Sequence, residues 1–252
     1  YNLVVIGSGP GGYVAAIRAA QLGMKVAVIE KSELGGICLN WGCIPTKSLL
    51  KSAQVYDFIK HAEDYGIRIE GEVVADFEKI IERSRGVADG MSKGIQFLLK
   101  KNKIDVIEGF GKLLKPGLIE VTNSSGERSQ VDAEKIILAT GARSRELPNL
   151  PQDGKKIIGY REALVLNKKP ASMVVVGSGA IGTELASFYN SMGTEVTLVE
   201  FMPEIVPNED VEVSKALARS LKKAKIKVMT SSSVESVDTT GDLCKVLIKT
   251  KK

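Results

Sequence analysis

Hydrophobic and polar residues follow one another along the chain in a pattern that occurs twice. A short apolar run, Leu3–Ile6, leads into a glycine-rich turn and a helical pattern of small residues that ends at Gly23. A second apolar run, 25–30, then ends in an acid. The same succession begins again at Met173, 170 positions later, and its helix ends at Gly193. Each copy is typical of a strand–helix–strand unit, so we predict an α/β protein with parallel sheets.

Further elements are expected between and after the two copies. Helical spacing predicts helices over 44–62, 76–101, 161–167 and 211–224. Short apolar runs predict strands at Ile104–Ile107, Leu118–Val121, Lys135–Ala139, 226–230 and 244–249. Two prolines, a glycine and several charges make Ser144–Lys156 the expected boundary, which divides the chain into domains 1–147 and 148–252. In each domain we expect a parallel sheet flanked by helices, together with a short β-meander.

Both glycine-rich turns have the spacing G-x-G-x-x-G, given by Gly7, Gly9 and Gly12, and by Gly177, Gly179 and Gly182. The first glycine allows a tight turn, the second lets backbone N–H groups approach a pyrophosphate, and the third lets the helix pack closely. Glu30 and Glu200 each follow the third glycine by 18 positions, where a carboxylate can bind a ribose hydroxyl. Ordinary glycine turns are the alternative. The strand, helix and acid around both copies favour two Rossmann-like dinucleotide sites.

Glu200 also bears on which nucleotide the second site binds. A carboxylate there repels a 2′-phosphate, and no Lys or Arg occurs between Glu200 and Lys215. The second site is therefore predicted to prefer NAD to NADP. An Arg from elsewhere in the fold is the alternative.

Two cysteines, Cys38 and Cys43, lie five positions apart in a glycine-rich stretch. In a regular helix their Cα atoms would be roughly 8–9 Å apart, beyond the roughly 7 Å that a disulfide spans. A disulfide therefore requires a distorted turn, which Asn40 and Gly42 can supply. A strained, accessible disulfide near a helix start is typically redox-active. Two reduced cysteines in a loop, or half of a metal site, are the alternatives. The only histidine is His61 and there is no second cysteine pair, so no metal is expected.

The composition is that of an ordinary globular protein of one large or two smaller domains, since 44% of the 252 residues are hydrophobic and 26% are charged. The net charge of +5 is spread along the chain without a long basic run, so it gives no support for nucleic-acid binding. No apolar stretch approaches the roughly 18 residues that span a bilayer. Since the chain starts without Met, a removed targeting peptide is possible, and the expected compartment is the bacterial cytoplasm or the mitochondrial matrix.

Four stretches together resemble the flavin-dependent pyridine nucleotide–disulfide oxidoreductases, and most closely their dihydrolipoamide dehydrogenase branch. They are the two glycine turns, the run Gly35–Lys47 around the cysteines, and Ala139–Ala142. They occur in the family's order and cover the chain from end to end. Leu39 and Ile44 favour the lipoamide branch over the glutathione reductases.

The resemblance implies FAD in the first domain and NAD in the second. Near FAD it places the first glycine turn with Pro10, the acid Glu30 on the adenosine ribose, and Lys31, Gly36, Gly111, Thr140, Gly141 and Ala142. It makes Cys38 the thiol that meets lipoamide and Cys43 the thiol against the flavin. Lys47 matches a lysine beside the flavin N5 that pairs with Glu184, and we expect this pair to be partly buried. Glu200 and Val234 match NAD-site positions.

The activity implied by the resemblance is oxidation of dihydrolipoamide through a Cys38–Cys43 disulfide and FAD, with NAD as final hydride acceptor. The implied partners are dihydrolipoamide on an acyltransferase lipoyl domain or glycine-cleavage carrier, and a second copy in a homodimer. Neither nucleic acid nor a membrane is expected as a partner. One alternative is an NADPH-dependent disulfide or mercuric-ion reductase, and another is a non-catalytic cofactor-binding fragment.

Part of the family pattern has no match in this chain. Family members have a central domain and a dimer-interface domain after the NAD domain, with a catalytic His–Glu pair, and both are expected to be absent here. His61 lies in a polar helical segment and is expected to be solvated rather than catalytic. Cys244 lies in a late strand and is expected in the core.

Overall fold

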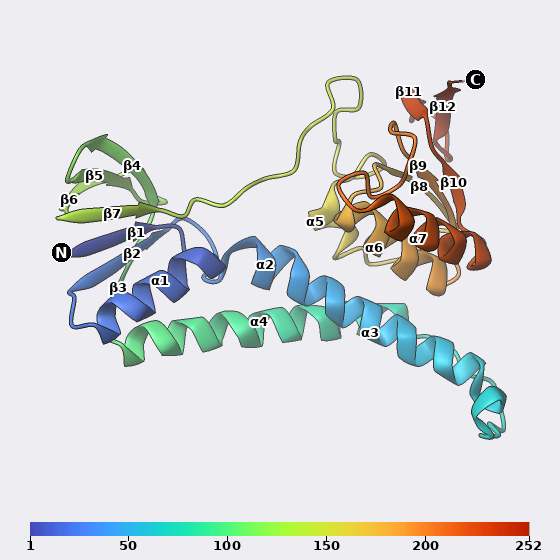
Figure 1. Cartoon of the computed structure of the whole chain (residues 1–252), viewed down its shortest axis with the longest axis horizontal. Coiled ribbons are helices and arrows are strands. Elements are labelled where there is room, and N and C mark those ends of the chain that lie inside the picture. Colours follow the sequence, from blue (N-terminus) through green and yellow to red (C-terminus); the bar gives the residue numbers. More distant parts are fainter. Residues whose placement is uncertain (252) are drawn as a thin grey trace. The chain divides into compact units, whose positions relative to one another are not determined.

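The computed structural model describes residues 1–251, which form two compact units (Figure 1). The first unit contains Tyr1–Pro45 and Arg85–Arg143. The second contains Thr46–Ser84 and the chain from Ser144 onward. Two of the three boundaries between the units fall within the long helices α3 (Cys43–Lys60) and α4 (Phe77–Lys101).

The first unit is built on a parallel sheet with the strand order β3–β2–β1–β7. These strands are β1 (Leu3–Ile6), β2 (Val26–Glu30), β3 (Asp105–Glu108) and β7 (Lys135–Leu138). In the central strand, Leu3 is in register with Val26 on one side and Lys135 on the other. The helix α1 (Pro10–Gln21) connects β1 to β2, as parallel pairing requires.

Alternate side chains of β1 enter two different cores. Leu3 and Val5 pack with residues of α1 and α4, whereas Val4 and Ile6 pack against a β-meander. The antiparallel meander consists of β4 (Phe110–Lys115), β5 (Leu118–Thr122) and β6 (Arg128–Asp132). Figure 1 shows α1 and α4 on one face of the sheet and the meander on the other. Burial on both faces explains why β1 is continuously apolar.

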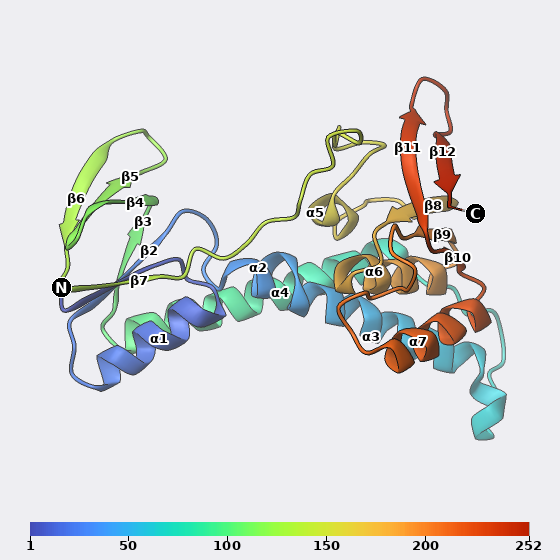
Figure 2. The same ribbon diagram turned by 45° about the horizontal axis from the view of Figure 1, so that its top comes forward.

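The second unit has a parallel three-stranded sheet in the order β10–β9–β8. Its elements are α5 (Tyr160–Ala163), β8 (Ser172–Val176), α6 (Ala180–Ser191), β9 (Glu195–Val199), α7 (Val211–Lys223) and β10 (Lys227–Met229). The largest core cluster joins α6, β9 and α7 with Leu49 of α3, and Phe188 and Tyr189 are fully buried in it. A hairpin of β11 (Ser232–Asp238) and β12 (Lys245–Thr250) extends from this sheet (Figure 2).

The structure confirms the predicted α/β class with parallel sheets and an antiparallel meander. Several local features differ from the predictions. The cysteine stretch begins with a short helix that was not predicted, α2 (Gly36–Trp41), and a short 3₁₀ helix, η1 (Ala62–Tyr65), follows α3. Among the described residues of the second unit the antiparallel part is the two-stranded hairpin, not a meander. The strands β4, β6 and β11 were not predicted, because much of each is polar or exposed and lacks a clear apolar run.

The division into units differs from a simple cut of the chain. The third boundary between the units falls at Arg143–Ser144, at the start of the expected boundary, but Thr46–Ser84 belongs to the second unit. This segment, which lies in the helical hairpin of α3 and α4, belongs to the second unit because its residues Leu49, Ala53 and Ile81 pack into the core with α6 and β9. The assignment of 1–147 to FAD and 148–252 to NAD stays a prediction.

Candidate functional site

The first glycine turn connects β1 to α1 and depends on two glycines. Gly7 has φ +102°, in the left-handed region, and a Cβ there would overlap the backbone oxygen of Ala139. A Cβ on Gly12 would overlap the carbonyl oxygen of Gly7. Gly9 differs, because a Cβ there would meet nothing within 4 Å. It is the N-cap of α1, and Pro10 follows it as the first helical residue.

The second turn repeats this arrangement between β8 and α6. Gly177 has φ +95°, and a Cβ on Gly182 would overlap the carbonyl oxygen of Gly177. Gly179 is the N-cap of α6 and again faces open space. In both copies close backbone packing therefore requires the third glycine, and a left-handed φ favours glycine at the first position, which in the first copy also packs on Ala139. The second glycine leaves room beside a helix N-terminus.

Glu30 and Glu200 bind back to these turns. The Ser8 backbone N–H and hydroxyl donate to Oε2 of Glu30, at 2.9 and 2.6 Å. The corresponding Ser178 groups donate to Oε2 of Glu200, at 2.8 and 2.7 Å. The other oxygen, Oε1, accepts from the backbone of Lys31 and Ser32 in the first copy and of Met202 in the second.

Glu200 is 7% exposed, and two effects on its pKa oppose each other. Burial raises the pKa, but hydrogen bonds from the Met202 backbone and from Ser178 lower it. The result is a pKa below the ordinary value, so the carboxylate is ionised at neutral pH. An ionised acceptor is the form that receives hydrogen bonds from a ribose.

The residues of both turns fit a dinucleotide. Each turn has open space at its second glycine, a helix N-terminus beside it and an acid tied to the turn. These are the features that a pyrophosphate and its ribose require. Gly36, with φ +64°, lies against the first turn, because a Cβ there would come 2.7 Å from Cα of Gly9.

The two cysteines lie on either side of a break between two helices. Cys38 is in α2 and partly buried, while Cys43 is exposed and is the first residue of α3. Gly42 interrupts the helix with φ −145° and ψ −115°. A Cβ on Gly42 would be 3.0 Å from the Ile37 carbonyl oxygen and 3.4 Å from Cα of Cys38, so the turn closes tightly there. The two cysteines lie near disulfide distance, which agrees with the distorted turn predicted from their spacing.

Side chains that the sequence did not single out hold this turn. Arg85 of α4 donates to the carbonyl of Asn40 at 2.6 Å, and its guanidinium lies 4.3 Å from the centroid of the Trp41 ring. The Trp41 indole N–H donates to Glu33 at 3.2 Å, and the Asn40 amide donates to the carbonyls of Leu34 and Gly36. Because Arg85 lies 45 positions from Asn40 in sequence, no local pattern indicates this contact.

Lys47 and Glu184 form the predicted ion pair within the second unit. The Lys47 ammonium donates to Oε1 of Glu184, across 137 positions of sequence. The Glu184 side chain is 32% exposed and that of Lys47 is 62% exposed, so the pair is less buried than expected. An exposed pair of this kind contributes about 0–1 kcal/mol to stability.

The remaining residues predicted near FAD lie in three parts of the first unit. Lys31 directly follows Glu30, and its ammonium lies 5.7 Å from the Phe110 ring centroid. Gly111 in β4 packs against Ile6 and Ile29, which leave little room for a Cβ. The exposed turn that follows β7 contains Thr140, Gly141 with φ +72°, and Ala142. Their roles toward a cofactor stay predictions.

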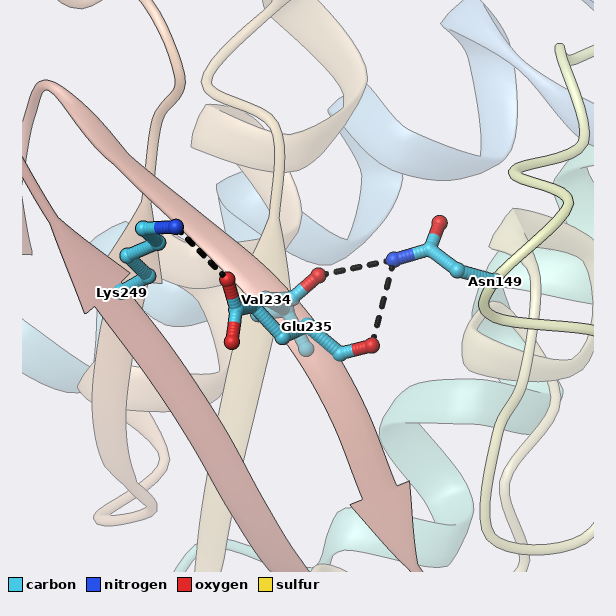
Figure 3. A network of polar contacts seen from close by, with 4 residues as sticks. All are labelled: Asn149, Val234, Glu235 and Lys249. Atoms are coloured by element: carbon cyan, nitrogen blue, oxygen red, sulfur yellow. Dashed lines mark hydrogen bonds and ion pairs between the residues drawn. The ribbon is translucent and has the colours of Figure 1, made fainter.

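Val234, predicted near NAD, lies at an irregularity in the hairpin. The register of β11 with β12 shifts between Val234 and Ser236, leaving Glu235 without a partner in the register. The amide of Asn149 donates to the carbonyls of Val234 and Glu235, at 2.9 and 3.4 Å (Figure 3). The Glu235 side chain also pairs with Lys249 of β12 at 3.4 Å (Figure 3). Asn149 thus supplies hydrogen bonds to carbonyls at the bulge.

The other candidate residues lie outside these sites. The His61 side chain is 59% exposed and contacts Asp57, as expected for a solvated histidine. The expectation for Cys244 was wrong, since it is exposed and precedes β12, in the connection between the two hairpin strands. Residues 1–251 contain no group of three His, Cys, Asp or Glu side chains that could hold a metal. No helix in that range is long and apolar enough to cross a membrane.

Two dinucleotide-type turns and a cysteine pair after the first of them define a class of protein. The sequence profile described as pyridine nucleotide-disulphide oxidoreductase matches residues 1–252. The chain belongs to this family.

Within this family the chain is similar to proteins named dihydrolipoyl dehydrogenase. The dihydrolipoyl dehydrogenase of Rhizobium etli is 50% identical over 253 residues, covering 94% of this chain and 52% of the relative. That of Zymomonas mobilis is 51% identical over 237 residues, covering 94% and 51%. The crystal structure of LpdA from Mycobacterium tuberculosis superposes with a TM-score of 0.90 at 29% identity, covering 98% of this chain and 55% of LpdA. The chain spans about half the length of these relatives.

Proposed function

We propose that this chain provides the two nucleotide sites and the redox dithiol of a dihydrolipoyl dehydrogenase. The observation that carries the proposal is the break at Gly42, which sets Cys38 near disulfide distance of Cys43 directly after a dinucleotide-type turn. Relatives named dihydrolipoyl dehydrogenase at about half identity support the lipoamide branch.

The chemistry of the dithiol is a thiol–disulfide exchange. A thiolate of dihydrolipoamide attacks Sγ of Cys38, the Cys38–Cys43 bond breaks, and Sγ of Cys43 leaves with the electron pair. The second substrate thiol loses its proton and attacks the mixed disulfide at the substrate sulfur. Lipoamide leaves as a cyclic disulfide, and Cys38 leaves as a thiolate. Two electrons then reside on the cysteine pair.

The family resemblance implies different roles for the two sulfurs, with Cys38 as the thiol that meets lipoamide and Cys43 as the thiol against the flavin. Cys43 is the first residue of α3, and Cys38 lies in the preceding short helix, whose turn Arg85 and Asn40 hold. In the proposed exchange Cys38 therefore receives the substrate thiolate and Cys43 leaves as a thiolate.

The cofactors follow from the fit of the two turns. Gly9 and Glu30 would hold the pyrophosphate and ribose of FAD, and Gly179 and Glu200 those of NAD. Bound FAD supplies the two-electron acceptor between the dithiol and the nicotinamide. The carboxylate of Glu200 favours NAD over NADP, and this separates the proposal from an NADPH-dependent reductase. For Lys47 and Glu184 the proposed role is the one that the resemblance implies, a lysine beside the flavin N5 that pairs with a glutamate.

The exchange step is tested without any cofactor. The reduced chain is mixed with lipoamide, quenched with an alkylating agent and mapped by mass spectrometry. We expect two protein thiols to be lost for each dihydrolipoamide formed, with the new bond between Cys38 and Cys43.

Three variants make this test specific. Cys38→Ser and Cys43→Ser each abolish the stoichiometric exchange, while Cys244→Ser, which changes an exposed thiol on the hairpin, leaves it unchanged. A disulfide that involved Cys244, or exchange that survived Cys38→Ser, would contradict the proposal and favour a cofactor-binding role without redox chemistry.

A further inference from the structure

One hydroxyl in each glycine turn bonds to two other parts of its unit. The Ser8 hydroxyl donates to Oε2 of Glu30 at 2.6 Å and accepts the Gly35 backbone N–H at 3.2 Å. Ser8 is fully buried. Gly35 is the N-cap of α2, the helix that contains Cys38. A single hydroxyl therefore joins the turn, the acid at the end of β2 and the start of the redox helix.

The second turn contains the same arrangement 170 positions later. The fully buried Ser178 hydroxyl donates to Oε2 of Glu200 at 2.7 Å and accepts the Val206 backbone N–H at 3.1 Å. Val206 lies in the connection from β9 to α7 and has φ +42°. The loops after the two acids differ in sequence and structure, yet each directs one N–H to the same hydroxyl.

The glycine spacing does not require this contact. In G-x-G-x-x-G the second position has no prescribed residue, and its backbone N–H alone already reaches the acid in both copies. The hydroxyl adds a second bond to the same carboxylate oxygen, Oε2. Hydrogen bonds to an ionised acceptor are stronger than neutral ones, so this bond holds the carboxylate firmly.

We infer that Ser8 and Ser178 are positioning residues for nucleotide binding, each fixing the orientation in which its acid meets the ribose. The inference rests on the proposed function. The turn holds Oε2, and the backbone of the following loop holds Oε1 through Lys31 and Ser32 or through Met202, so the carboxylate is fixed from both sides. The same hydroxyl anchors that following loop, so acid and loop are held in one arrangement before the nucleotide binds.

Removal of the hydroxyl leaves the rest of the turn bonded. The Gly35 N–H also donates to the Ser8 carbonyl at 3.1 Å, and the Val206 N–H to the Ser178 carbonyl at 3.2 Å. The carboxylates keep their bonds from the serine backbone. Ser8→Ala and Ser178→Ala are therefore expected to fold, which makes them usable in binding measurements.

The two variants are controls for each other. We expect Ser178→Ala to weaken NAD binding about tenfold by calorimetry, since one bond to a charged group is lost, with FAD retention unchanged. Ser8→Ala is expected to speed FAD dissociation by a similar factor, with NAD affinity unchanged. Equal NAD affinity in the wild type and Ser178→Ala, or equal loss in both alanine variants, overturns the inference.

A double-mutant cycle distinguishes positioning from a general structural role. If Ser178 acts through Glu200, Ser178→Ala weakens NAD binding in the wild-type background but has little further effect beside Glu200→Gln. The same tenfold loss in both backgrounds contradicts the inference. If the alanine variant is unfolded at the measuring temperature, two other variants test the inference. Ser178→Thr keeps the hydroxyl and Ser178→Cys weakens the donor, so Ser178→Thr must bind NAD more tightly than Ser178→Cys.

Failure of the inference and failure of the proposed function give different results. A wild-type chain that binds neither FAD nor NAD contradicts the nucleotide sites themselves. A wild-type chain that binds both, with alanine variants that bind equally well, removes only the role of the hydroxyls.

Discussion

The two glycine turns share the same local structure but are followed by different segments. Both have a left-handed first glycine, a third glycine packed on the first, a buried serine and an acid bonded to it. They differ in the segment that comes after the acid. After Glu30 the chain reaches Gly35 and the cysteine helix, whereas after Glu200 it reaches Val206 and then the N-cap of α7, Asp210. The frame of glycines, serine and acid is thus repeated, and the two copies differ in the segment that the serine hydroxyl holds after the acid.

The surroundings of the two copies also differ. β1 is buried on both faces, between α1 and α4 on one side and the meander on the other. In β8, by contrast, Met173 and Val175 pack on the core while Val174 and Val176 are 37% and 43% exposed. The turn geometry is the same in both settings, so it depends on local backbone packing more than on the burial of the preceding strand.

The largest expected effect is a loss of stability, and it distinguishes the third glycine of each turn from the second. Gly12→Ala and Gly182→Ala place a Cβ on the carbonyl oxygen of Gly7 or Gly177, so we expect a loss of about 3 kcal/mol in the free energy of unfolding. Chemical denaturation measures it.

Gly9→Ala and Gly179→Ala are the matched controls, since a Cβ there meets open space. They are expected to change the free energy of unfolding by less than about 1 kcal/mol and to weaken nucleotide binding instead. If Gly12→Ala were as stable as Gly9→Ala, the packing account of the turns would be wrong.

The next effect concerns the acid of the second copy. Glu200→Arg removes a charged hydrogen bond to the ribose and makes a 2′-phosphate acceptable, so NAD affinity should fall roughly tenfold to a hundredfold while NADP affinity rises. Calorimetry with both nucleotides checks this. Glu209→Arg, an equal charge change at an exposed position, is the control. Unchanged NAD affinity in Glu200→Arg would show that the acid does not bind the ribose.

The smallest expected effect concerns a feature of the first copy alone, the turn between Cys38 and Cys43 that Arg85 holds. Arg85→Gln removes the stacking on Trp41 and weakens the bond to the Asn40 carbonyl, at a cost of about 1–2 kcal/mol. Trp41 is the single tryptophan, so its fluorescence reports on this turn directly. We expect greater acrylamide quenching and slower Cys38–Cys43 disulfide formation.

Arg83→Gln is the control for Arg85, because it lies two positions earlier in α4 and bonds to Ser48 and Ser52 of α3. It should leave the Trp41 signal unchanged. Equal quenching in the wild type and Arg85→Gln would show that the guanidinium does not hold the turn.

The sequence predicted the parts of the site that depend on short-range spacing. Glycine spacing, the acid at the end of the next strand and the need for a distorted turn between Cys38 and Cys43 all follow from local geometry. The Lys47–Glu184 pair followed from the resemblance, although the exposure of Lys47 did not. The contacts that complete the site join residues far apart, such as Ser8 with Gly35 and Arg85 with Asn40.

The incorrect local predictions have a related cause. A strand such as β6 is held by pairing with β5 more than by an apolar face, so its sequence shows little alternation. The helical character of the cysteine stretch was missed because its glycines are typical of turns. Only the packing of Gly36 on Gly9 and of Gly42 on Cys38 shows that these glycines permit close approach at the ends of α2.

We propose that the first turn binds FAD next to a dithiol made of Cys38 and Cys43. The absorption spectrum of the FAD-loaded chain, recorded during titration with one equivalent of dihydrolipoamide, tests this arrangement. We expect a long-wavelength band from a thiolate close to the flavin, which is lost in Cys43→Ser and kept in Cys244→Ser. A chain that binds no flavin, or an identical band in Cys43→Ser, would contradict it.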